Sequence, residues 1–104
     1  ILVRAIGESG EDLKALKKLD YEILDRDIYW FVFTDSSIET NYKGELQDNF
    51  YRVTLNNYFT DTETNVVLIG KDGGIKQKGK HLDLQGLFDL IDTMPMRQLE
   101  MRKN

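Results

Sequence analysis

The sequence of 104 residues contains no cysteine, one proline and one histidine. Without cysteine the chain cannot form a disulfide, use a thiolate nucleophile or bind a metal through cysteine sulfur. Because His81 is the only histidine, the chain also lacks the paired imidazoles that many zinc sites use. A chain without cysteine is compatible with the cytosol and equally with the periplasm or the cell exterior. These absences exclude thiol redox chemistry and leave the compartment open.

A surplus of positive charge is also missing, since the formal net charge is -4. Nucleic acids and anionic membranes attract clustered basic surfaces, so we expect neither as a partner. No run of about 20 apolar residues is present, so we expect no direct membrane insertion, and the sequence shows no recognisable signal segment. We interpret the lysines of the second half as a solvated strand edge; they are Lys71, Lys76, Lys78 and Lys80.

The residues that are present are typical of a soluble globular protein, with 40% hydrophobic and 31% charged side chains. The length suits one hydrophobic core and is short for two, so we predict a single domain over residues 1–104. The clearest element is residues 66–75, where an apolar run meets Asp72-Gly73 and an extended segment follows toward Lys78. Because Asp-Gly favours the positive φ angles of tight turns, this pattern predicts a β-hairpin.

The rest of the chain predicts an alternation of strands and helices. Uninterrupted apolar runs at 1–6 and 28–33 indicate buried strands, and helical periodicity indicates a helix from Glu11 to about Leu24, with Ser9 and Asp12 resembling a capping box. We predict a loop at 35–44, a helix at 45–58 and a helix from the N-cap Asp83 to Thr93. The resulting order β-α-β-α-β-β-α predicts a thioredoxin-like α/β fold, with a central mixed sheet flanked by helices.

This order places the strand at 28–33 at a sheet edge, although it is unusually apolar for an edge. An exposed apolar edge strand invites pairing with another chain. We therefore expect residues ahead of Ile1 or a second chain, in a homodimer or with a protein partner, to cover it.

Three strings of residues carry a resemblance to a known family. The first string is Arg26-Asp27, before the second strand. The second includes Gly70, Lys71, Asp72, Gly73 and Gly74. The third, at the end of the last predicted helix, includes Asp92, Met94, Pro95, Met96 and Arg97. The chain thereby resembles the domain of unknown function number 4174, a peroxiredoxin-like module of bacterial secreted proteins, also found in Equarin and sushi-repeat-containing matrix proteins. The resemblance implies a thioredoxin-like fold, a periplasmic or secreted location and no established activity.

In thioredoxin-like redox enzymes the reactive thiol follows the first strand, and a proline precedes the hairpin. Here Gly7, Glu8, Ser9 and Gly10 occupy the first place, and Thr64 and Asn65 occupy the second. No residue at either place undergoes thiol exchange. We therefore predict no catalytic residue and no cofactor, and we predict that these six residues form a ligand-binding site at the vacant thiol position.

Other patterns favour structural roles over chemistry. The glycines at 70–74 lack the order of a phosphate-binding loop and lead into a strand, so a hairpin turn is favoured. For the methionines near Pro95, packing in the core is favoured over a soft metal site. The sequence Asp25-Arg26-Asp27 predicts a local ion pair. We place the loop carboxylates Asp35, Glu39, Asp61 and Glu63 in solvated loops, without calcium-loop spacing.

Together these patterns predict an uncharacterised, non-redox binding or interaction module. One alternative is a cysteine-independent enzyme, hydrolytic or metal-assisted, using the loop end of the sheet near residues 7–10 and 64–65. A second alternative is a purely structural domain. A deep pocket with converging polar side chains at that loop end would support the enzyme, and a flat or filled surface would exclude it.

Overall fold

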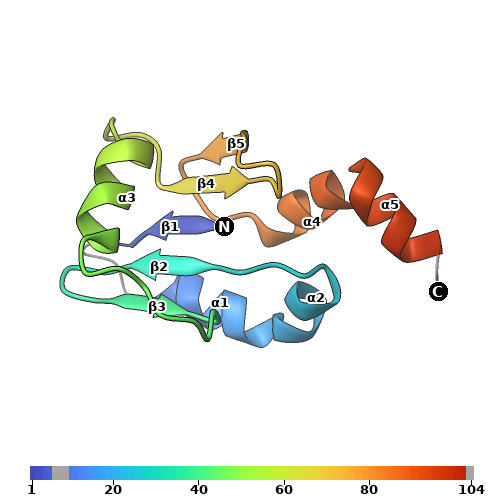
Figure 1. Ribbon diagram of the computed structural model, residues 1–104, viewed down its shortest axis with the longest axis horizontal. Coiled ribbons are helices and arrows are strands. Elements are labelled where there is room, and N and C mark those ends of the chain that lie inside the picture. The colour runs from blue at the N-terminus through green and yellow to red at the C-terminus, as the bar shows by residue number, and fades with distance from the viewer. Residues whose placement is uncertain (6–9, 103–104) are drawn as a thin grey trace.

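The computed structural model describes residues 1–5 and 10–102, which form one mixed sheet with helices on both faces (Figure 1). In chain order the elements are β1 (Leu2–Arg4), α1 (Glu11–Lys18), α2 (Asp20–Asp25), β2 (Phe31–Phe33), β3 (Ile38–Thr40), α3 (Phe50–Tyr58), β4 (Val66–Ile69), β5 (Ile75–Gly79), α4 (Leu84–Asp92) and α5 (Pro95–Arg102).

The sheet has the strand order β3-β2-β1-β4-β5. Strands β1 and β2 are parallel, as predicted for strands joined by a helical crossover, whereas β4 is antiparallel to β1 and β5 is antiparallel to β4. Apart from the additional strand β3, this is the predicted arrangement, in which the hairpin of β4 and β5 extends the parallel pair of β1 and β2. The mixed sheet flanked by helices confirms the thioredoxin-like α/β fold class.

The prediction that residues 28–33 form an edge strand is wrong, because β3 lies in the stretch that we expected to be a loop. Strand β2 covers Phe31–Phe33, and β3 pairs with it along its whole length. The amide of Thr34 donates to the carbonyl of Ser37 at 2.9 Å, which closes a tight β2–β3 hairpin. The chain therefore covers the apolar edge of β2 itself, and the reason for expecting a partner at residues 28–33 no longer applies.

Two predicted helices also differ in detail. The helix predicted from Glu11 begins there but divides at Leu19, whose φ of -101° and ψ of 24° separate α1 from α2. The helix predicted at 45–58 begins only at Phe50, and its residue Val53 is exposed. The face of α3 that contacts the sheet instead carries Thr54 and a group of larger side chains, namely Phe50, Tyr51, Leu55 and Tyr58.

The core has two parts, one on each face of the sheet. On one face Leu16, Ile23 and Phe88 bring α1, α2 and α4 against the sheet. On the other face Phe33 stacks on Phe50 of α3 with ring centroids 5.9 Å apart. Since alternate residues of a strand point to opposite faces, neighbouring residues of β1 and β2 supply both parts of the core.

The hairpin and the helix after it are as predicted. The amides of Gly70 and Gly73 close the turn, Gly73 has a φ of 87°, and a bulge interrupts the ladder at Leu68 and Ile69. Asp83 caps α4 by accepting from the amide of Gly86 at 3.1 Å. Helix α4 ends at Asp92, next to the predicted end at Thr93, and Pro95 begins α5, because its fixed φ suits the first turn of a helix.

Candidate functional site

A hollow of about 120 Å³ opens at the carboxyl ends of β1 and β2, beside the first turn of α1. Its lining comes from three segments that meet because parallel strands end at the same edge of a sheet. The apolar part of the lining is Ala5, Leu13 and Val32, and the remainder is Gly10, Asp12, Thr34 and Asp35. The hollow therefore combines an apolar wall with two carboxylates and a hydroxyl group.

The β2–β3 turn holds its side of the hollow in place. The hydroxyl of Thr34 lies 2.8 Å from the hydroxyl of Ser37, and the carbonyl of Thr34 accepts a short hydrogen bond from the hydroxyl of Tyr51. These bonds connect the turn to α3 and present Asp35 at its tip. On the opposite side, Gly10 takes a φ of 85° and begins α1, which places Asp12 in the first helical turn.

The structure places the six predicted ligand-binding residues in different surroundings. Gly10 lines the hollow, whereas Gly7, Glu8 and Ser9 lie outside the described residues. Thr64 and Asn65 lie just before β4, which runs antiparallel beside β1, but neither lines the hollow. Sequence reasoning missed Asp12, Thr34 and Asp35 as a group, although the end of each predicted parallel strand was the signal that could have found them.

Thr64 and Asn65 instead surround Arg4. The guanidinium of Arg4 donates to the side-chain oxygen of Asn65 at 3.0 Å and to the carbonyls of Asp61 and Thr64 at 2.9 and 2.8 Å. It also lies 5.3 Å from the centroid of the Phe59 ring. With these contacts Arg4 connects β1 to the segment between α3 and β4, which is a structural role.

Asp61 organises the same segment from the other side. Its carboxylate accepts from the amides of Thr64 and Glu63 at 2.6 and 2.8 Å. The bond from the Thr64 amide, followed by that from Glu63, lowers the pKa of Asp61 because both stabilise the charged form. Of the carboxylates that we predicted in loops, Asp35 alone lines the hollow, while Glu39 lies within β3 and Glu63 pairs with Lys80 at 3.4 Å.

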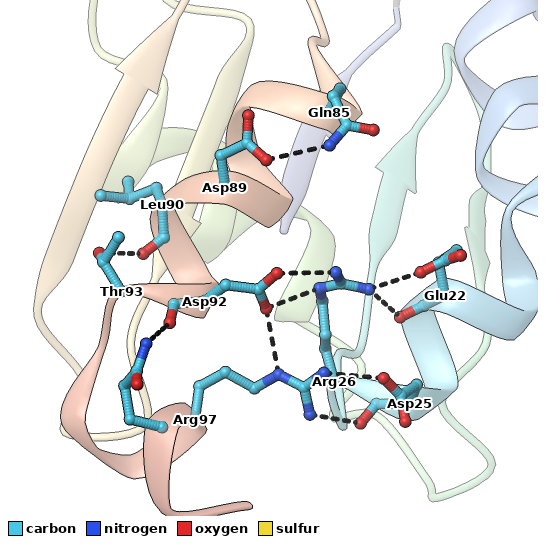
Figure 2. Close-up of polar contacts among 10 residues, drawn as sticks. Glu22, Asp25, Arg26, Gln85, Asp89, Leu90, Asp92, Thr93 and Arg97 are labelled. Atoms are coloured by element: carbon cyan, nitrogen blue, oxygen red, sulfur yellow. Dashed lines mark hydrogen bonds and ion pairs between the residues drawn. The ribbon is translucent and has the colours of Figure 1, made fainter. Parts of the chain in front are cut away.

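A second polar group, which we call the arginine cluster, consists of Glu22, Asp25, Arg26, Asp92 and Arg97 (Figure 2). Arg26 binds the carboxylate of Asp92 through Nε and Nη2 at 3.1 and 2.8 Å, and Arg97 binds Asp92 through Nε at 3.1 Å. Arg97 also binds the carboxylate of Asp25 at 2.7 Å, and Arg26 binds Glu22 at 2.8 Å. The cluster joins α2, α4 and α5.

The electrostatics of the cluster follow from these bonds. The side chains of Arg26 and Arg97 are 11% and 8% exposed, so each needs carboxylates nearby to remain stably charged. The hydrogen bond from Arg26, and then that from Arg97, lowers the pKa of Asp92, and the bond to Asp92 raises the pKa of Arg26. Arg26 also lies 4.5 Å above the centroid of the Phe88 ring, which packs its planar group against the core.

The arginine cluster corrects one prediction and unites two of the family strings. Asp25, Arg26 and Asp27 do not form a local ion pair with one another: Arg26 pairs with Asp92, Asp25 with Arg97, and Asp27 with Lys71 at 3.3 Å. Met94 packs against the core, as expected for a residue near the end of a helix. The side chain of Met96 is not among those that the structure describes. Arg26, Asp92 and Arg97 therefore have structural roles.

No histidine or basic residue is among the described residues that line the hollow, and His81 is an exposed residue between β5 and α4. Over residues 1–5 and 10–102, no group of three or more His, Asp or Glu side chains is arranged to hold a metal ion. Within the same ranges, every helix is too short or too polar to cross a membrane.

Comparison with known proteins gives one match. The family model described as "Domain of unknown function (DUF4174)" matches residues 8–100. No curated protein and no solved structure matches the chain. The matched range includes all three strings of residues that carry the resemblance.

Proposed function

The chain belongs to the DUF4174 family, and we propose that it is a thiol-independent binding domain whose ligand inserts one small group into the hollow beside α1. The observation that supports this proposal is the hollow itself. It lies where parallel strands of an open α/β sheet end, which is a general position for ligand sites. Its volume of about 120 Å³ suits the end of one side chain better than a whole metabolite.

The charge of the lining selects the ligand class. The amino end of a helix such as α1 carries roughly half a positive charge, which by itself favours an anion. Asp35 brings a negative charge to the same hollow, and Asp12 is a second acidic residue of its lining, so the sum favours a cation. Ala5, Leu13 and Val32 favour an apolar stem. The ligand group is therefore the end of a lysine or arginine side chain, presented by a partner protein.

An amide-resolved NMR titration tests this function with two probes, N-acetyl-arginine amide and N-acetyl-lysine amide, against N-acetyl-aspartate amide. We expect one of the two cationic probes, at millimolar concentration, to shift the amides of Gly10, Thr34 and Asp35, while the aspartate probe does not. Asp35→Asn and Asp12→Asn should each weaken the binding at least threefold, because each removes one carboxylate.

Asp48→Asn is the matched control, since it removes one exposed carboxylate outside the hollow. It should bind the probes as the unmodified chain does. Equal binding of the cationic and the aspartate probes would contradict the proposal, as would binding that Asp35→Asn and Asp12→Asn leave unchanged. A complete lack of shifts at the hollow would contradict it as well.

We further propose that the domain works in the periplasm or outside the cell. One feature supports this location, namely the resemblance to modules of secreted proteins, and the absence of cysteine is compatible with it without favouring it over the cytosol. Fractionation of cells that express the epitope-tagged natural protein tests the location. Recovery of the tagged protein in the cytosolic fraction would refute it.

A further inference from the structure

Strand β5 forms an open edge of the sheet. Its residues Ile75–Gly79 pair with β4 alone in the strand order, and β5 is the longest strand in the described part of the chain. The residues Ile75, Lys76, Gln77 and Lys78 are all exposed. In an edge strand, alternate backbone N–H and C=O groups point away from the sheet and are open to another strand.

The opposite edge of the sheet is less accessible. Strand β3 covers only Ile38–Thr40, and Ile38 and Thr40 are half-buried. Ile38 packs against the core beneath α3. A further strand would therefore find a longer and better exposed edge at β5.

The side chains at the β5 edge are cationic. Lys76 and Lys78 lie within the strand, and Lys71 and Lys80 lie close to its two ends. Three of these lysines form ion pairs with exposed carboxylates: Lys76 with Asp72 at 2.9 Å, Lys71 with Asp27 at 3.3 Å and Lys80 with Glu63 at 3.4 Å. Exposed ion pairs of this kind contribute little to stability, so carboxylates of a partner can replace them.

We propose that β5 accepts an extended acidic segment of another protein, which adds a strand to the sheet and places carboxylates opposite Lys76 and Lys78. The backbone ladder supplies the affinity of such an added strand, and the opposed charges select the partner. The β5 edge is distinct from the hollow, because none of its residues lines the hollow. Variants of β5 residues and variants of the hollow therefore test the two proposals separately.

A second copy of this chain does not fit the edge. Pairing of β5 with β5 would bring Lys76 and Lys78 against the same lysines, and like charges on opposed strands are unfavourable. Pairing of β5 with β3 would join different surfaces head to tail and would not close into a dimer. The charge of the edge therefore favours an acidic segment from a different protein.

Fluorescence anisotropy tests the proposal with a labelled peptide that alternates glutamate and valine. Two comparison peptides separate the contributions of backbone and charge. One has the same sequence with the alternate amides of one edge N-methylated, and the other replaces glutamate by lysine. We expect the glutamate peptide to bind at least tenfold more tightly than both, because N-methylation removes the ladder and lysine reverses the charge.

On the protein side, Lys76→Glu combined with Lys78→Glu should weaken binding of the glutamate peptide at least tenfold. Lys14→Glu combined with Lys17→Glu, an equal charge change on exposed residues of α1, should leave it within twofold. Equal binding of the N-methylated peptide would overturn the proposal, and this comparison uses the unmodified protein, so it does not depend on how the variants fold. Undetectable binding of the glutamate peptide, or an equal loss in the α1 variant, would overturn it too.

Discussion

Arg97 shows how a charged residue can belong to the interior of this protein. It is 8% exposed, yet its guanidinium meets the carboxylates of Asp25 and Asp92. A buried cation without such partners costs several kcal/mol, whereas a paired one with complete hydrogen bonds is tolerated. Since Asp92 accepts bonds from both Arg26 and Arg97, it is the residue on which the arginine cluster depends most.

Asp92→Asn should destabilise the protein by about 2 kcal/mol, because it leaves two largely buried guanidiniums without their shared carboxylate. The side chain of Asp92 is itself 30% exposed, which keeps the loss below that of a fully buried pair. Urea unfolding measures the change. Asp89→Asn is the matched control on the same helix, since its partner Gln85 is exposed, and it should change the stability by less than about 0.5 kcal/mol. Equal effects of the two variants would show that the cluster does not stabilise the fold.

The contribution of Asp92 should also depend on pH. Because its pKa is lower in the folded protein than in the unfolded chain, the carboxylate stabilises the fold fully above the unfolded pKa of about 3.9. The stabilisation is lost as the pH falls through the folded pKa. The difference in unfolding free energy between the unmodified chain and Asp92→Asn should stay constant from about pH 7 to 5 and shrink below about pH 4. A difference that stays the same down to about pH 2 would contradict this assignment.

The sequence drew attention to every residue of the arginine cluster except Glu22, but it did not show which of them form pairs. Arg26 and Asp92 belong to recognisable strings, yet they lie 66 positions apart. Sequence spacing favours the neighbours of a residue, so it predicted that Arg26 pairs with Asp25 or Asp27. The actual partners are set by the crossover connection, which brings α2 beside α4. This proximity can be recognised only when the arrangement of the sheet is known.

At the scale of elements, strong local signals predicted the fold correctly and weak ones failed. The hairpin at 66–79 and the cap at Asp83 are encoded by their own residues. Strand β3 has only three residues within a polar stretch, and it forms because β2 offers an apolar edge to pair with. The same limit applies to the hollow, because its lining residues come from two separate parts of the sequence.

Gly73→Ala tests the turn that begins β5. A side chain at the φ of 87° found at Gly73 costs about 1 kcal/mol, since L residues avoid the left-handed region. Gly79→Ala is the matched control in the same hairpin, because a Cβ there would meet the His81 carbonyl at an ordinary 3.5 Å and Gly79 does not have a positive φ. Thermal unfolding should show a lower midpoint for Gly73→Ala than for Gly79→Ala. The reverse order would mean that the turn tolerates another conformation.

At the scale of the whole molecule, the two proposed binding surfaces and the arginine cluster occupy separate regions. The hollow lies at the carboxyl ends of the parallel strands, and β5 is an edge on the far side of β4. The arginine cluster joins α5 to α2 and α4 through ion pairs. Helix α5 extends beyond the sheet at the end opposite α3 (Figure 1). This separation predicts that α5 can open while the sheet and both surfaces remain folded.

Hydrogen exchange tests that prediction. Among the α5 side chains that the structure describes, Arg97 alone is buried, while Leu99 and Met101 are 55% and 37% exposed. The α5 side chains that the structure describes therefore offer few apolar contacts against local opening, and we expect α5 amides to exchange at least tenfold faster than those of β4. Arg97→Met should accelerate exchange in α5 further without changing β4, whereas Arg52→Met, on the exposed side of α3, should alter neither. If Arg97→Met accelerates exchange equally in α5 and β4, the helix unfolds only together with the sheet, and the contacts of Arg97, like those between Arg26 and Asp92, stabilise the whole fold.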